Sequence, residues 1–135
     1  MVLTGSPRED GNSATLAEAF INGAKDKGHS IVKFNVSDKK TLGCIACNSC
    51  YSKDKACPFD DSFSEFANLL EGVDALVIST PMYWFSFPAQ LKSIIDKFYA
   101  FEVAEKKLTI TESMLLTCGE LSSEDVFSGM IESHK

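Results

Sequence analysis

The chain has 135 residues, of which 44% are hydrophobic and 24% are charged. These values are typical of one globular domain that buries about two-thirds of its unfolded surface, and they exclude a disordered segment. The net charge of -6 opposes binding to nucleic acid or to an anionic membrane surface. No apolar run approaches the ~20 residues of a membrane span, and no segment has the pattern of a signal peptide. We therefore expect a single cytoplasmic domain over residues 1–135, without nucleic-acid or membrane partners.

A loop of small and polar residues near the start of the chain separates a short apolar strand, Met1–Thr4, from an amphipathic helix. The helix is predicted to begin near Ala14 and to end at Gly28. Backbone N–H groups at a helix start lack partners, and the helix dipole favours negative charge there. The side chains that add donors for a phosphate are Ser6, Arg8, Asn12 and Ser13. The loop therefore predicts a phosphate site; the alternative is that Asn12 or Ser13 only caps the helix.

Two common nucleotide-binding motifs do not fit this loop. No Gly-Lys-Ser/Thr sequence ends it, so hydrolysis of a nucleoside triphosphate is disfavoured. It also lacks the G-x-G-x-x-G pattern, which disfavours a dinucleotide bound to this loop.

Strands and helices alternate along the rest of the chain. The further predicted strands are Ile31–Val36, Val73–Ser79 and Ser113–Thr117. Three further helices are predicted: one that follows Asp60 or Asp61, one that contains Leu91 to Phe98, and one that begins near Ser122 or Ser123. The side chains predicted to face the core are Leu16, Ala17, Phe20, Ile21 and Ala24, then Phe63, Phe66, Leu69 and Leu70, then Leu91, Ile94, Ile95 and Phe98, and finally Val126, Phe127, Met130 and Ile131. This alternation predicts an α/β fold, a doubly wound parallel sheet in three α/β/α layers.

Loops after the first, third and fourth strands are expected to meet, because ligands of open α/β sheets bind beyond the carboxyl ends of the strands. The loop after the third strand carries the consecutive aromatic residues Tyr83, Trp84 and Phe85. One loop cannot direct all three rings into a core, so some are exposed or cover a flat apolar ligand; the alternative is that they close the top of the core. The fourth strand ends in Thr117-Cys118-Gly119-Glu120.

Four of the five cysteines form the pattern Cys44-x2-Cys47-x2-Cys50-x6-Cys57, followed by Pro58. Gaps of two residues let successive thiolates converge on one metal centre, and ferredoxins use a similar run that ends in Cys-Pro. A structural zinc site with four cysteine ligands and plain reduced thiols are the alternatives. An odd number of cysteines also suits a reducing cytosol better than disulfides. Cys118 stands apart and is not expected to be a ligand.

The sequence Gly5-Ser6-Pro7-Arg8, followed by Gly11-Asn12-Ser13, resembles the phosphate loop of the NADPH-dependent FMN reductases and iron-sulfur flavoproteins, within the flavodoxin-like superfamily. The later loops and the cysteines match as well, so the resemblance covers nearly the whole chain. The resemblance implies that the FMN phosphate is held by Ser6, Arg8, Gly11, Asn12 and Ser13. It implies that the isoalloxazine ring is wrapped by Pro81, Met82, Tyr83, Trp84 and Phe85, and that its pyrimidine edge is faced by Thr117, Cys118 and Gly119. It also implies that a [4Fe-4S] cluster near FMN is held by Cys44, Cys47, Cys50 and Cys57.

The resemblance implies an FMN-dependent oxidoreductase that takes a hydride from NAD(P)H and reduces a flavin, a quinone or a similar small-molecule acceptor, or a redox protein. No catalytic side chain is expected, because the flavin carries the chemistry. One alternative is an electron carrier with FMN and a [4Fe-4S] cluster but no NAD(P)H activity, and another is a non-enzymatic protein with structural zinc. Members of the family continue through a fifth strand and a final helix, so this chain looks truncated, or borrows that edge from a partner. They often dimerise, so we expect a homo-oligomer.

Overall fold

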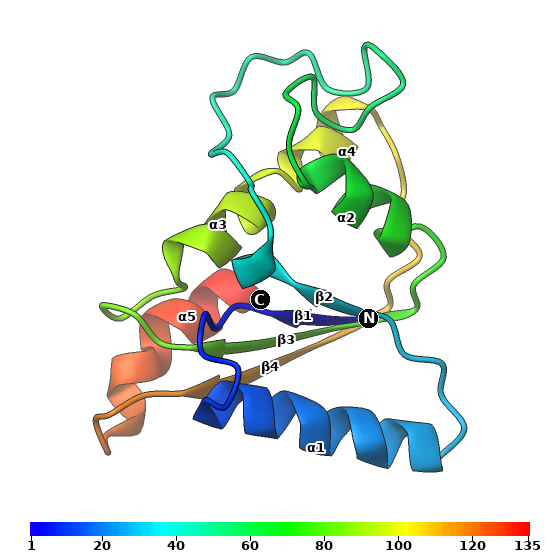
Figure 1. The fold of residues 1–135 in the computed structure, drawn as a ribbon. Helices are drawn as coiled ribbons and strands as arrows, with labels where there is room; N and C mark the ends of the chain where they lie inside the picture. Colours follow the sequence, from blue (N-terminus) through cyan, green and yellow to red (C-terminus); the bar gives the residue numbers. More distant parts are fainter.

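The computed structural model describes residues 1–135 as a four-stranded parallel sheet with helices on both faces (Figure 1). The strands are β1 (Val2–Thr4), β2 (Lys33–Asn35), β3 (Ala75–Pro81) and β4 (Glu112–Cys118). The α-helices are α1 (Asn12–Asp26), α2 (Phe63–Leu70), α3 (Ala89–Asp96), α4 (Tyr99–Val103) and α5 (Ser128–His134), and the 3-10 helices are η1 (Val36–Asp38) and η2 (Glu124–Phe127). The strand order is β2-β1-β3-β4, which confirms the doubly wound topology.

The central strands β1 and β3 are buried on both faces, so their sequences read as nearly continuous apolar runs. Leu3 pairs with Phe34 of β2 on one side and with Ile78 of β3 on the other. All three pairings of the sheet are parallel. Every strand therefore ends at the same edge of the sheet.

Helix α1 alone covers one face of the sheet, where Ala17 and Ile21 pack against Val2 and Val77. The larger part of the core lies on the other face. Its buried side chains include Leu3, Phe34, Phe63, Phe66, Leu70, Ile78, Leu91, Ile94, Phe101 and Met130. Figure 1 shows α1 on one side of the sheet and α2, α3 and α4 on the other, which confirms the three layers.

The start of α2 is held by the residue before its N-cap, since Ser62 at the N-cap forms no side-chain cap. A carboxylate oxygen of Asp61 accepts the backbone N–H of Phe63 at 3.0 Å. Asp60, the other candidate cap, is exposed. In the helix that follows, the ring of Phe66 lies 5.2 Å from that of Phe34 and 5.7 Å from that of Phe98, so aromatic packing joins α2 to β2 and to the residue before α4.

Three predicted core residues are instead exposed: Leu16, Leu69 and Ile131. Each lies at the margin of its helix's apolar face. Leu16 meets solvent because α1 is the only helix on its side of the sheet. Leu69 lies beside the open edge of β2, where it shares a surface hollow with Lys33.

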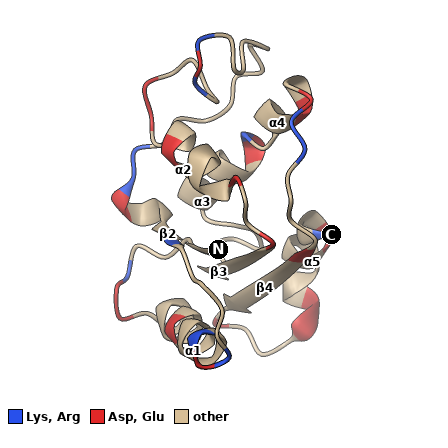
Figure 2. Ribbon diagram, turned by 90° about the vertical axis from the view of Figure 1, so that its right-hand side faces the viewer, with Lys and Arg blue, Asp and Glu red and all other residues tan.

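Several predicted elements are shorter than expected. The helix predicted over Leu91 to Phe98 ends at Asp96 as α3, and a further helix, α4, follows from Tyr99. The last predicted helix begins as the 3-10 turn η2. The second strand covers only Lys33–Asn35. Charged residues lie mainly on the helices and connecting loops, while the strands have few of them (Figure 2). None of the helices has both the length and the apolar character that crossing a membrane requires.

Candidate functional site

The loops after β1, β3 and β4 meet at the carboxyl edge of the sheet, as expected. The N–H of Gly5, after β1, donates to the carbonyl of Ser79 in β3 at 3.0 Å. The N–H of Met82, after β3, donates to the carbonyl of Cys118 in β4 at 2.8 Å. Backbone hydrogen bonds therefore tie all three loop origins together, and the structure brings the residues of the predicted flavin site to one edge.

The first loop presents the uncapped N-terminus of α1. The N-cap is Gly11, and no side chain caps the helix, so the alternative that Asn12 or Ser13 only caps α1 is wrong. The first intrahelical donor is Thr15, whose N–H reaches the carbonyl of Gly11 at 3.0 Å. The N–H groups of the preceding helical residues have no intrahelical acceptor, which is the arrangement that proteins use to bind anions.

Some residues of this loop are held by hydrogen bonds within the protein, and others have exposed side chains. The hydroxyl of Ser6 accepts the N–H of Arg8 at 3.1 Å and donates to its carbonyl at 3.2 Å, which folds the loop into a tight turn. Ser13 is buried, and its carbonyl accepts the hydroxyl of Ser79 at 2.7 Å. Arg8 and Asn12 are exposed, so their side chains are free to contact an anion.

The second loop turns its aromatic rings outward. Trp84 is 91% exposed, and Tyr83 and Phe85 are about half exposed. The prediction that some rings are exposed is confirmed, and the alternative that the three close the core is wrong, because the next residues, Phe87 and Pro88, are buried there instead.

Backbone strain accompanies this exposure. Trp84 and Phe85 have φ angles of 47° and 63°, a left-handed conformation that costs about 1–3 kcal/mol for a residue other than glycine. The turn is closed by two hydrogen bonds between Tyr83 and Ser86, at 2.9 and 3.1 Å. Strain of this kind is concentrated in loops that bind ligands.

Small residues allow the three loops to approach one another. A Cβ atom at Gly5 would lie 2.7 Å from the hydroxyl of Thr80 and 2.9 Å from Cδ2 of Leu91. A Cβ atom at Gly119 would lie 3.0 Å from Cε of Met82 and 3.2 Å from the ring of Phe127. Gly5 therefore leaves no space for a side chain, whereas at Gly119 the end of Met82 and the ring of Phe127 would have to move by a few tenths of an ångström.

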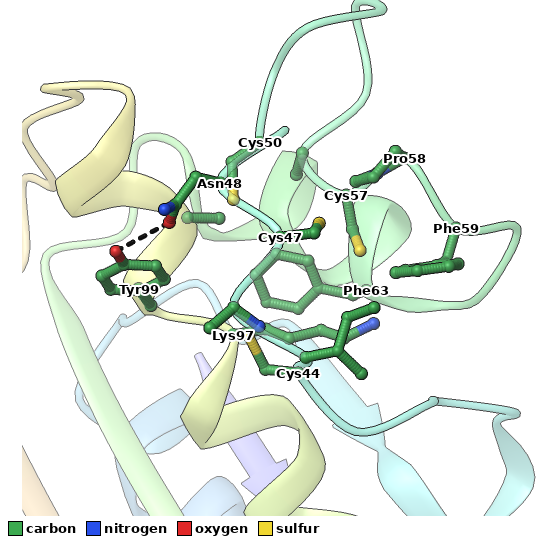
Figure 3. A pocket seen from close by; sticks show the side chains of 14 residues that line it. Cys44, Cys47, Asn48, Cys50, Cys57, Pro58, Phe59, Phe63, Lys97 and Tyr99 are labelled. Carbon is green, nitrogen blue, oxygen red and sulfur yellow. Dashed lines mark hydrogen bonds between the residues drawn. The ribbon is translucent and has the colours of Figure 1, made fainter.

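The four clustered cysteines line a separate pocket, with Lys97, Tyr99 and Phe63 among its other walls (Figure 3). All four are free thiols; Cys44 and Cys47 are exposed, Cys50 is half-buried and Cys57 is buried. No three of their sulfur atoms are close enough together to hold a metal ion. Burial raises the pKa of Cys50, and the neighbouring thiols Cys47, Cys57 and Cys44 raise it further. Cys118 does not line this pocket, in agreement with the expectation from its position.

The backbone of this cysteine loop turns repeatedly between the thiols. Ala46, Asn48 and Tyr51 have φ angles of 53°, 53° and 55°, and the N–H of Ala46 lies 3.5 Å from the sulfur of Cys44. The hydroxyl of Tyr99 donates to the side-chain oxygen of Asn48 at 2.9 Å, which fastens the loop to α4. Hydrogen bonds to sulfur are one of the means by which proteins tune metal–thiolate centres.

The cysteine pocket shares no lining residue with the three loops of the sheet edge. Helix α3 connects the two regions, because Ala89 follows the aromatic loop and Lys97, directly after the helix, lines the pocket. Eight helical residues span about 12 Å. The sequence does not indicate that Lys97 lines a pocket, since a lysine at the end of an amphipathic helix normally lies in solvent.

Comparisons with known proteins agree on a family of flavin-dependent proteins. Residues 1–119 match the family described as NADPH-dependent FMN reductase. An iron-sulfur flavoprotein from Archaeoglobus fulgidus is 32% identical over 95 residues, which are 70% of this chain and 43% of that protein. One from Methanosarcina thermophila is 30% identical over 95 residues, which are 70% of this chain and 49% of that protein. The chain thus spans about half the length of these curated relatives.

Among solved structures, the fold is similar to that of an NAD(P)H:quinone oxidoreductase from Methanothermobacter marburgensis. The TM-score is 0.76 and the identity 20%, over 98% of this chain and 70% of the other. At this identity the likeness concerns the fold, which is flavodoxin-like.

Replacing Gly5 with Ala should destabilise the protein by about 1–3 kcal/mol, because the added methyl group would overlap Thr80 and Leu91. Gly23→Ala is the matched control. Gly23 lies inside α1 with open space around it, so its replacement should stabilise the helix by about 0.5–1 kcal/mol. Urea denaturation measures both, and a Gly5→Ala variant as stable as the wild type would contradict the close packing of the loops.

Proposed function

Since the chain belongs to the NADPH-dependent FMN reductase family, we propose that it binds FMN at the carboxyl edge of its sheet and acts as an oxidoreductase. The observation that carries the proposal is the meeting of an uncapped helix N-terminus, an exposed aromatic loop and a glycine-lined third loop at one edge. Bound FMN supplies hydride and single-electron chemistry. The chain's task is therefore to bind and orient this group.

Each loop suits a different part of FMN. The N–H groups that begin α1 and the guanidinium of Arg8 would hold the phosphate. The ring of Trp84 offers a flat apolar surface for the isoalloxazine, with Tyr83 and Phe85 beside it. Backbone groups near Gly119 would face the pyrimidine edge of the ring, and donors there would stabilise negative charge on it.

The reductant in this proposal is NAD(P)H, and the acceptor is a flavin, a quinone or a similar small molecule, or a redox protein. The support is the family membership together with the exposure of Trp84, which leaves room for a second flat ring on the same loop. No acid or base is required from the chain, since a hydride is transferred between two rings.

We also propose that Cys44, Cys47, Cys50 and Cys57 hold a [4Fe-4S] cluster. Four thiols on one pocket wall are the right donors in number and type, and the relatives with about 30% identity are named iron-sulfur flavoproteins. The thiols would have to draw together, because they do not yet converge. Two of them, Cys44 and Cys47, are exposed and lie on a loop without regular secondary structure, which permits this movement.

Arg8→Ala should weaken FMN binding by about 10- to 100-fold, since a charge-assisted hydrogen bond contributes about 1.5–3 kcal/mol. Titration of apo-protein with FMN, followed by the quenching of flavin fluorescence, measures the affinity. Lys25→Ala at the opposite end of α1 is the control and should bind FMN as the wild type does. An unchanged affinity in the Arg8 variant would remove the phosphate assignment, and a wild type that does not bind FMN would end the proposal.

Trp84→Ala should lower FMN affinity by about 2- to 10-fold, because an aromatic stacking pair contributes about 0.5–1.5 kcal/mol. The free energy of unfolding should change by less than about 0.5 kcal/mol, since the side chain is 91% exposed. Ile45→Ala removes another exposed apolar side chain, 67% exposed, from the cysteine pocket. That control should leave FMN affinity unchanged; equal losses in both variants would deny Trp84 a specific role.

Protein purified without oxygen and reconstituted with FMN, iron and sulfide should show flavin bands with a broad cluster absorption beneath them. Cys47→Ser should lose the broad absorption and keep the flavin bands, whereas Cys118→Ser should keep the broad absorption, because Cys118 lies outside the pocket. Flavin bands alone in the wild type would leave the cysteines as plain thiols. Zinc bound in place of iron would favour a structural site.

A further inference from the structure

A buried ion pair lies beneath the cysteine pocket. The ammonium group of Lys97 contacts the carboxylate of Asp61, and the two side chains are only 3% and 0% exposed. The other ion pairs of the molecule lie at the surface. A buried ion pair is often no more stabilising than an apolar pair of the same size, so stability alone does not account for this one.

Asp61 joins three segments around the pocket. Besides Lys97, its carboxylate accepts the N–H of Leu42 at 3.0 Å and that of Phe63 at 3.0 Å. Leu42 lies two residues before Cys44, Phe63 begins α2, and Lys97 follows α3. One carboxylate thus fixes the entrance of the cysteine loop against the ends of two helices.

Of the two residues of this ion pair, Lys97 is the one that lines the cysteine pocket. It lines the pocket with the four cysteines, whereas Asp61 does not, and the remaining lining residues, apart from the cysteines, are uncharged. Figure 3 shows its side chain among the cysteines and beside Phe63, and the ammonium lies 5.6 Å from the centre of that ring. Lys97 is therefore the one positively charged residue on the wall of the cysteine pocket, and its ammonium is held by Asp61.

We infer that Lys97, held in place by Asp61, is a positioning residue that fits the pocket to an anionic metal–thiolate centre. The inference rests on the proposed cluster site. A centre with four thiolate ligands has a net negative charge, and each added electron increases it. A cation at the pocket wall, shielded from water, stabilises that charge, and it stabilises the reduced form of the centre more than the oxidised one. Lys97 should therefore favour uptake of the metal and raise the reduction potential.

The test compares the wild type with the double variant Lys97→Met/Asp61→Asn, which removes both charges and keeps one oxygen acceptor, for the N–H of Phe63. After anaerobic reconstitution with iron and sulfide, dithionite titration in the presence of dyes of known potential measures the potential of the cluster. At a given potential, the ratio of oxidised to reduced cluster should be at least tenfold higher in the double variant, a shift of about 59 mV for one electron. Lys97→Arg, which keeps the charge, should stay close to the wild type.

A second readout does not need the cluster. Titration of the reduced apo-protein with Co²⁺, followed by thiolate-to-metal absorption, should give a dissociation constant at least tenfold higher in the double variant. Lys92→Met is the matched control on the same helix, because Lys92 forms an exposed ion pair with Asp96 one turn away. That control should match the wild type in both measurements. FMN affinity should be unchanged in all variants, since the pocket shares no residue with the sheet-edge loops.

The outcomes separate the role of Lys97 from the proposed cluster site. A double variant with the potential and Co²⁺ affinity of the wild type would overturn the role of Lys97 and leave the cluster site in place. A wild type that takes up neither iron and sulfide nor Co²⁺ would overturn both. If the double variant does not fold, as judged by circular dichroism, Lys97→Gln removes the charge while its amide can still donate to Asp61, and the same shifts are expected.

Discussion

The parallel pairing of β3 with both β1 and β4 is the constraint on which the rest of the structure depends. Because all strands run in one direction, each ends at the same edge, and the three loops that follow have to share that edge. The hydrogen bonds from Gly5 to Ser79 and from Met82 to Cys118 extend this pairing beyond the strand ends. The proposed FMN site therefore depends on sheet geometry, with only a few residues of each loop specialised for binding.

Sequence patterns predicted the layers, the doubly wound parallel sheet and the loops that meet, because those depend on regular periodicity and on short turns. The exposure of side chains at the margins of the apolar helix faces was harder to predict. Leu16 and Leu69 have the same helical spacing as their buried neighbours, and only the number of helices on each face decides which of them meets solvent. The end of the helix after the aromatic loop also has no local signal, since neither proline nor glycine separates Asp96 from Tyr99.

The pocket chemistry was predictable in part. The spacing of the cysteines indicated a common site, and the structure places all four around one pocket. The ion pair beneath it was not predictable, because Asp61 and Lys97 are 36 residues apart in sequence and only the tertiary fold brings them together. The sequence indicated that Asp60 or Asp61 begins α2, and the bond from the N–H of Phe63 is one of the three contacts that the Asp61 carboxylate makes.

The two candidate sites differ in how far their residues are already in place. At the sheet edge, backbone hydrogen bonds and closely packed glycines fix the loops, so FMN would bind to a largely formed surface with only the aromatic side chains left to adjust. In the cysteine pocket the thiols still have to converge, so the free energy of metal binding has to offset the ordering of the loop. The contacts of Asp61 with Leu42 and of Tyr99 with Asn48 reduce that cost, because they hold the loop at two points before any metal binds. A loop held at these two points, with thiols that can still draw together, would bind the proposed metal centre without disturbing the sheet edge, to which α3 connects it.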